Sequence, residues 1–474
     1  MATGLLGIAL SGLAAAQAGI STTQHNIANI NTAGFRRQEV DYAARTANFF
    51  GNSHFGSGVA VSTVRNLYSQ FQDSQVLLNQ AQLSRNEAFA GQASQIDKLV
   101  GDKDSGLTTA LDTFFSASQT VASDPTSNAA RQVMLSSGRN LAARINNLAT
   151  AFRDIRNDGN REVAVTVSNI NTLTSQIADL SSNIARAEGT ASDAQPANDL
   201  RDQRDNLVAQ LNKLINVTPV QQTDGAFNLY VGNGQPLLIG ASAMRMSSIP
   251  DATNPEFNVP ALNLPGGITL PLDSDLISGG TLGGLLAARD SVLLPAMQDL
   301  DTLAFELATR FNAQHQLGFD KTGAAGNLFF ADLATLANPP ENAASAFAMH
   351  AGMTNPNLIA ASATAAGSPG DNANALLLAG LQTQANTVNG SDTFASAYAQ
   401  LVARTATLAA EADINVAAYE TLTKLSVQSQ QAISGVNLDE EAANLIRFQQ
   451  AYQASAKSLQ IASSLFDELL AILR

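Results

Sequence analysis

The sequence predicts a mainly α-helical protein with β insertions (α+β), in which paired N- and C-terminal coiled-coil helices adjoin a long-helix-bundle core that carries a β subdomain. Three observations lead to this fold class. Apolar residues recur every seven positions at both ends of the 474-residue chain, which is the repeat of supercoiled helix pairs. Long internal stretches space their apolar residues three and four apart, whereas one central stretch alternates with a period of two. The length exceeds that of a usual single domain, so we expect several structural units.

Composition excludes several classes of function. The formal net charge is −14 and no basic stripe interrupts it, so the chain is a poor nucleic-acid binder, because that binding needs clustered Lys and Arg. The absence of cysteine excludes disulfides, thiolate zinc sites, iron–sulfur clusters and cysteine nucleophiles. Charged residues make up only 14% of the chain and aromatic residues 5%, a balance that suits long helices packed on small side chains.

The amino-terminal segment should form a helix with a heptad seam. The residues seven apart on it are Leu6, Leu13, Ile20 and Ile27. We expect the helix to stop at Asn31–Gly34, with Gly34 in the left-handed conformation that ends many helices. The segment looks like a signal-peptide core, but no charged residue precedes Arg36, and a signal needs a basic start. Its apolar stretch is short and interrupted by Ser, Gln and Gly, so we expect neither a cleaved signal nor a membrane span.

The carboxyl-terminal segment repeats this period. Its residues seven apart are Leu438, Leu445, Tyr452, Leu459, Phe466 and Leu473. Asn437 or Asp439 is a suitable cap for the start of this helix. Each terminal segment has only the other to pack on, so we expect the two to pair. The ten heptad residues are the predicted contacts with the partner terminal helix or with a neighbouring subunit; the alternative is that each segment is an ordinary core helix.

The elements between the two ends are expected in the following order. Residues 35–66 are Gly-containing and alternate locally, which indicates extended or β-hairpin structure. Four helical stretches follow, over residues 67–100, 107–122, 127–188 and 196–214. The third should kink or break at Asp158-Gly159-Asn160, and Pro196 suits the first turn of the fourth.

The chain then changes to a period of two from Val217 to about Ser274, with the hairpin signals Asp224-Gly225 and Asn233-Gly234. Helix should return over residues 282–315, with a kink at Pro295, and again over 393–433, separated by a loop-rich stretch over 318–370. These elements group into four predicted units: a terminal coiled-coil domain (1–34 and 435–474), an extended or β linker (35–66), a helical core (67–216 and 279–434) and a β-rich subdomain (217–278).

No motif in the sequence indicates catalytic, cofactor-binding or metal-binding chemistry. The four histidines are scattered, and none has a second ligand three or four residues away. The glycine-rich run over residues 279–284 lacks the Lys-Ser/Thr of a phosphate loop. Adjacent acidic residues such as Glu440-Glu441 point to different sides of a helix and cannot share a substrate. Arg36-Arg37 is the densest basic spot and is too small for a membrane or nucleic-acid patch.

The two ends of the chain also resemble a known family. Residues 9–40, ALSGLAAAQAGISTTQHNIANINTAGFRRQEV, resemble the amino-terminal signature shared by flagellar rod, hook and hook-associated (axial) proteins. Residues 434–470, SGVNLDEEAANLIRFQQAYQASAKSLQIASSLFDELL, are similar to the carboxyl-terminal signature of the hook-associated protein 1 family, the first hook–filament junction subunits. Three internal stretches resemble the same family: residues 198–211, 282–326 and 371–378. The stretch after Phe330 is short beside the outer insertion of many members, so we expect no substantial outermost domain.

This resemblance implies a non-enzymatic structural subunit of the bacterial flagellum, extracellular and exported by the flagellar type III apparatus without signal cleavage. The paired terminal helices would form an inner tube and the remainder an outer layer. The implied partners are other copies in a ring, the hook protein, the second junction protein (hook-associated protein 3) and an export chaperone that binds the carboxyl-terminal segment, with no nucleic acid and no membrane. The terminal segments are expected to be disordered before assembly.

Two alternatives remain open at this point. A hook or rod subunit would share the amino-terminal signature, but its middle should be nearly all β. An exported cell-wall hydrolase on an axial-protein scaffold would need a carboxylate pair in a cleft, and the lack of Trp and scarcity of Tyr disfavour a sugar-binding cleft.

Overall fold

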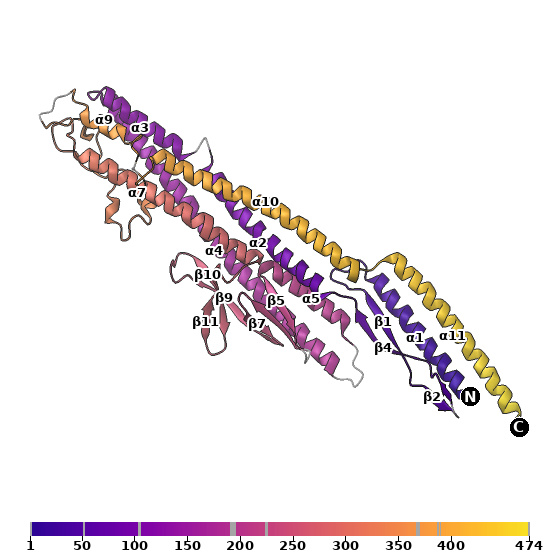
Figure 1. Cartoon of the computed structure of the whole chain (residues 1–474). Coiled ribbons are helices and arrows are strands. Elements are labelled where there is room, and N and C mark those ends of the chain that lie inside the picture. Colours follow the sequence, from indigo (N-terminus) through magenta and orange to yellow (C-terminus); the bar gives the residue numbers. More distant parts are fainter. Residues whose placement is uncertain are drawn as a thin grey trace.

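The protein is elongated, with both termini at one end and the helical core at the other (Figure 1). The computed structural model describes residues 2–50, 53–102, 106–189, 196–222, 226–365, 370–385, 388 and 390–472. Helices predominate, and the strands form small antiparallel sheets. The predicted fold class, mainly α with β insertions, is confirmed.

The terminal helices α1 (Ala2–Ala28) and α11 (Leu438–Ile472) lie side by side and antiparallel. Strands β1 (Gln38–Ala44) and β4 (Val59–Asn66) form an antiparallel hairpin beside α1. The shorter strands β2 (Asn48–Phe50) and β3 (Ser53–Phe55) pair beyond it. The extended structure predicted between residues 35 and 66 is therefore confirmed.

The turn after α1 differs in part from the prediction. Gly34 has a φ of +80°, the left-handed conformation that was expected. The helix itself ends at Ala28, however, before the predicted stop at Asn31–Gly34. The Asn29 side chain donates to the His25 carbonyl (3.0 Å), and such local side-chain bonds compete with helical ones. A succession of turns therefore separates the helix from Gly34.

Long helices make up the core. They are α2 (Gln70–Val100), α3 (Leu107–Ser123), α4 (Asn128–Gly189), α5 (Asn198–Leu214) and α10 (Phe394–Ser434). Of the kink or break predicted at Asp158-Gly159-Asn160, the break is wrong, because α4 is one helix of 62 residues that runs through these three residues. Ile155 and Val163 are buried on either side, and their burial exceeds the cost of one helical glycine, about 1 kcal/mol. Pro196 lies before the α5 cap, Ala197, and not within the first turn.

A π-helical turn interrupts the helix just before Pro295, the residue at which a kink was predicted. Helix α6 (Gly280–Ala288) passes through a π-helical turn, η1 (Arg289–Leu293), into α7 (Leu294–Gln316), whose first turn contains Pro295. Proline has no N–H to donate to the preceding turn, and the ladder is rearranged where that donor is lost.

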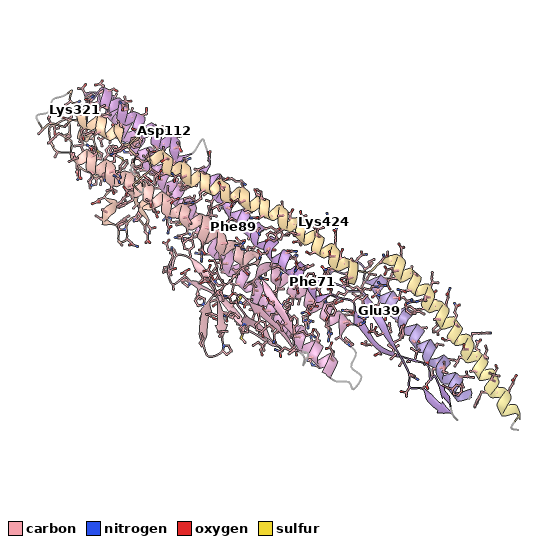
Figure 2. All side chains as sticks on the ribbon, in the orientation of Figure 1. Glu39, Phe71, Phe89, Asp112, Lys321 and Lys424 are labelled. Atoms are coloured by element: carbon pink, nitrogen blue, oxygen red, sulfur yellow. The ribbon has the colours of Figure 1, made fainter. Side chains whose placement is uncertain are left out.

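Short elements follow α7, as the loop-rich composition predicted. They are η2 (Leu333–Thr335), α8 (Ala343–Ala346), η3 (Pro356–Leu358) and α9 (Ala373–Gly380). Five phenylalanine rings from α3, α7 and this segment pack together near the end of the core remote from the termini: Phe114, Phe311, Phe329, Phe330 and Phe347. Figure 2 labels Asp112 and Lys321 at this remote end and Glu39 near the terminal helices.

The β subdomain lies against α4 (Figure 1). Its first sheet has the order β5-β6-β7-β8, with bounds Val217–Gln221, Phe227–Val231, Gln235–Ile239 and Ser242–Ala243. Its second sheet contains β9 (Arg245–Pro250), β10 (Asn258–Leu264) and β11 (Ile268–Pro271). Asn233-Gly234 turns β6 into β7, with Gly234 at φ +96°, as predicted. The Asp224-Gly225 signal lies outside the described residues.

Candidate assembly interface

The terminal helices meet along a seam to which α1 contributes small and polar residues. A Cβ atom added to Gly12 would lie 2.8 Å from Ser455 Oγ, and one added to Gly19 would lie 2.6 Å from the Phe448 ring. One heptad further along each helix, Asn26 Nδ2 donates to Glu441 Oε2 (3.2 Å). The contacts are therefore seven residues apart on both helices, and the missing side chains of the two glycines allow the close approach.

The large heptad residues of α1 flank this seam. Leu6, Leu13, Ile20 and Ile27 are each only half-buried, whereas the buried positions of the helix include Ala9, Ala15, Ala16 and Asn26. The seam lies one residue before the leucine and isoleucine heptad. Gly12, Gly19 and Asn26 share the same seven-residue spacing but were missed, because the predicted seam consisted of large apolar residues.

The large heptad residues of α11 are less covered. Leu445 and Leu459 are half-buried. Leu438, Tyr452 and Phe466 are exposed by 51%, 37% and 39%, and Leu473 lies outside the described residues. The single chain therefore leaves a row of large apolar side chains without full burial, and their assignment as interface residues stays a prediction.

An open groove adjoins these residues. It has a volume of about 560 Å³ and lies between α1, α11 and the beginning of β4. Its lining includes the exposed apolar residues Leu5, Ile8, Ile461 and Leu465. Contiguous exposed apolar surface of this kind marks contact sites with other molecules.

Helix α1 also has the length and hydropathy of a membrane span. Its Gly4–Ala28 portion has a mean hydropathy of 1.5, so the sequence-based expectation that it is too short is wrong on length. One such helix near an amino terminus is weak evidence for a membrane. In this structure the polar residues Ser11, Thr22, Thr23 and Asn26 of the helix are buried within the protein.

A buried polar network joins α1, β1 and α11. Asn26 Nδ2 donates to the Gln38 carbonyl (2.9 Å), and the Gln38 N–H donates back to Asn26 Oδ1 (2.9 Å). Arg37 Nε donates to Glu441 Oε1 (2.7 Å), the carboxylate that Asn26 also contacts. Each polar group named here has a hydrogen-bond partner, as polar groups that are removed from water require.

The neighbouring residue, Arg36, contacts the core instead. Its guanidinium pairs with Asp73 (2.8 Å) and Asp205, and its backbone N–H donates to Asp202 Oδ2 (3.0 Å). Burial raises the pKa of Asp202 to about 6, despite the lowering effect of the hydrogen bond from Arg36. As the densest basic spot of the sequence, Arg36-Arg37 was predicted only to be too small for a membrane or nucleic-acid patch, and this role was missed. The position of Arg36 in the sequence, directly between a predicted helix end and a predicted strand, was the feature that could have indicated this role.

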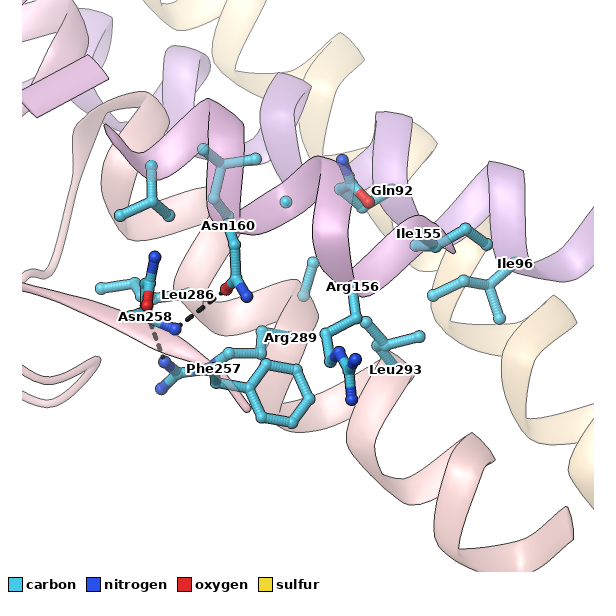
Figure 3. A pocket seen from close by; sticks show the side chains of 14 residues that line it. Gln92, Ile96, Ile155, Arg156, Asn160, Phe257, Asn258, Leu286, Arg289 and Leu293 are labelled. Carbon is cyan, nitrogen blue, oxygen red and sulfur yellow. Dashed lines mark hydrogen bonds between the residues drawn. The ribbon is translucent and has the colours of Figure 1, made fainter. Parts of the chain in front are cut away.

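The described residues contain no group of three or more His, Cys, Asp or Glu side chains placed to hold a metal ion. A cavity beside α4 has a volume of about 30 Å³ and is lined by residues such as Ile155, Phe257 and Leu286 (Figure 3). It has room for one or two water molecules. His315 is fully buried with both ring nitrogens engaged, by the Asn327 carbonyl and the Ala360 N–H, so it has a structural role.

Comparison with known proteins shows which family this chain belongs to. The family model described as the flagellar hook-associated protein FlgK helical domain matches residues 93–330. The chain is 32% identical to flagellar hook-associated protein 1 of Escherichia coli strain K12, over 99% of both chains. The chain belongs to the flagellar hook-associated protein 1 family. It is also 28% identical to the Bacillus subtilis protein of that name, over 97% of this chain and 96% of that one.

Two further matches concern the termini and the fold. A model of the carboxyl-terminal region of flagellar basal-body rod FlgEFG proteins matches residues 427–472, which include α11. The solved structure of the flagellar hook junction protein FlgK from Burkholderia pseudomallei superposes with a TM-score of 0.68 at 21% identity, covering 76% of this chain and all of that one. It supports the fold. The family membership favours a hook-associated protein over the hook or rod subunit and the hydrolase considered from sequence, and makes the chain part of the bacterial flagellum.

Proposed function

We propose that this protein is a non-catalytic structural subunit of the junction between hook and filament, and that its terminal helices assemble copies of it into a ring. One observation carries the proposal. On its α1 side the seam with α11 uses small and polar residues, so the described large apolar heptad residues of both helices are only partly buried and can be covered further by other subunits. A side chain such as Leu or Phe stabilises an interface by roughly 1.5–3 kcal/mol when it becomes fully buried.

The groove between α1, α11 and β4 supports the same proposal. Its walls are apolar, and it is open in the single chain. A helix of a neighbouring copy fits such a groove, because helices recognise apolar grooves through residues at three-, four- and seven-residue spacing. We propose the hook protein and hook-associated protein 3 as the neighbours at the two faces of the ring.

Export and protection before assembly complete the proposal. The chain would leave the cell through the flagellar type III apparatus without signal cleavage. A Sec signal peptide begins with basic residues, and no charged residue precedes Arg36. An export chaperone would cover α11, whose Leu438, Ile446 and Phe466 are exposed beside the charged residues Glu440 and Lys457. That amphipathic pattern suits capture of a helix in a groove.

The test is a deletion strain complemented with variants. A strain without the protein should build hooks and shed unpolymerised flagellin, and the wild-type gene should restore filaments. The triple change Leu445→Ser, Leu459→Ser and Phe466→Ser should abolish incorporation, because the interface loses its apolar contacts. The melting transition of the core should change little.

The matched control replaces three exposed polar residues of the same helix: Gln449→Ser, Gln453→Ser and Gln460→Ser. It should incorporate far better than the apolar triple variant. Both proteins must be detected in the medium at similar levels, so that failure of export is not taken for failure of assembly. Normal filaments from the apolar triple variant would overturn the assignment of these residues to the interface.

A further inference from the structure

Two adjacent arginines occupy the joint between the terminal helices and the core. Arg36 and Arg37 lie between the Gly34 turn and β1, and their guanidinium groups bind carboxylates of different elements. The Arg36 guanidinium contacts Asp73 at the start of α2 and Asp205 on α5. The Arg37 guanidinium contacts α11. One dipeptide therefore connects both sides of the joint.

The contact with the core is largely buried and is shared among several elements. The Arg36 side chain is 16% exposed and that of Asp202 is 6% exposed. Asp202 Oδ1 accepts from Asn66 Nδ2 at the end of β4 (2.7 Å), and Asp73 Oδ1 accepts from Gln430 Nε2 on α10. Breaking a buried ion pair leaves an uncompensated charge, so such contacts resist displacement.

The contact with α11 depends on the pairing of the terminal helices. Arg37 binds Glu441, which is 2% exposed, and Glu440. Glu441 is held at the same time by Asn26 of α1. The Arg37 N–H also donates to the Ser434 carbonyl at the end of α10 (2.9 Å). Arg37 therefore gains its carboxylate partners only when α11 lies against α1.

We propose that Arg36-Arg37 is a two-sided ion-pair latch that sets the direction of the terminal helix pair relative to the core and closes when α11 packs on α1. When α11 packs on α1, Glu440 and Glu441 come within reach of Arg37 and form ion pairs with it. The adjacent Arg36, bound to aspartates of α2 and α5, then fixes the orientation of the helix pair relative to the core. Because of the latch, the terminal helices pair with each other and take up their orientation relative to the core in the same step. It is a property of the chain itself and does not depend on the proposed ring.

The absence of cysteine allows a direct distance measurement in the full chain. Spin labels at Lys424→Cys on α10 and Gln453→Cys on α11, both exposed positions, report the direction of α11 across the joint; Figure 2 shows Lys424 on the outer side of α10. A second pair, Gln24→Cys with Gln453→Cys, reports the pairing of α1 with α11. Electron–electron double resonance gives both distance distributions, recorded over a titration with trimethylamine N-oxide, which favours the folded state.

We expect a narrow distribution for both pairs in the parent protein at some concentration of the osmolyte. Arg36→Gln should at least double the width for the pair across the joint and leave the pair within the terminal helices unchanged. Arg37→Gln should broaden both, because it also loosens α11. Arg65→Gln is the matched control, since its pairs with Glu39 and Asp41 are largely exposed and it should alter neither distribution.

Three outcomes would overturn the latch. The first is a width across the joint that Arg36→Gln leaves unchanged. The second is equal broadening by Arg65→Gln. The third is a parent distribution that stays broad at every osmolyte concentration, because the latch would then not be intrinsic to the chain.

Discussion

A single buried histidine should make the stability of the core depend on pH. Burial lowers the pKa of His315 to about 4, so the folded protein binds its proton less readily than the unfolded chain does. Stability from this residue is complete above the unfolded pKa, near 6.5, and is lost as the pH falls toward 4. The loss amounts to roughly 3 kcal/mol. Urea denaturation at pH 7 and pH 4.5 measures it, and His315→Gln should remove most of this pH dependence.

A second buried group opposes this effect. Asp202 acts with the opposite sign: burial raises its pKa to about 6, so its contribution is complete below the unfolded pKa and is lost as the pH rises through 6. The two effects oppose each other between pH 4 and 6, which is why single-site variants are needed. An unchanged slope in His315→Gln would contradict the assignment.

Residue identities were predictable where conformation selects one amino acid. Gly34 was identified because only glycine adopts a positive φ without steric cost, and its φ is +80°. Gly12 and Gly19 were missed because close packing between helices depends on the partner, Ser455 or Phe448, which lies more than 400 residues away in the sequence. Arg36 was missed for the same reason, since its three aspartates come from other elements.

At the scale of elements, α4 contains a correctable weakness. Gly159 lies in the middle of the helix, and a Cβ atom there would meet nothing within 4 Å. We expect Gly159→Ala to raise the free energy of unfolding by about 0.5–1 kcal/mol, because alanine loses less backbone entropy in a helix. Thermal or urea unfolding measures the change. Gly284→Ala is the contrasting variant, because its Cβ would clash with the Arg85 carbonyl, and it should destabilise the core.

The existence and type of most elements followed from periodicity. The 3.6-residue pattern predicted α2, α3 and α10, and the Asn-Gly pair predicted the turn between β6 and β7. The predictions failed where tertiary contacts overrode local signals. Asn160 fixes α4 at its supposed break by bonding to the β subdomain, with its Oδ1 accepting from the Asn258 N–H (2.9 Å; Figure 3). This contact joins residues far apart in the sequence, so the local pattern around Gly159 could not predict it.

At the scale of the whole molecule, we expect the two ends of the free subunit to be the least stable parts. Helix α11 contacts little besides α1 and leaves most of its residues exposed, and helices in proteins owe most of their stability to tertiary packing. Limited proteolysis of the purified monomer should therefore trim residues 1–35 and 435–474 and leave a stable core. A bound export chaperone should protect only the carboxyl-terminal side. Termini that resist protease in a verified monomer would indicate a conventional globular protein.

The glycine seam has a geometric consequence for any tube built from these helices. Where glycines face the partner, helix axes approach to about 8 Å, compared with about 10 Å between larger side chains. A wall made of such closely spaced pairs is thin. For a given outer diameter and number of copies, a thin wall encloses a wider bore, so in such a tube Gly12 and Gly19 would favour a wide bore.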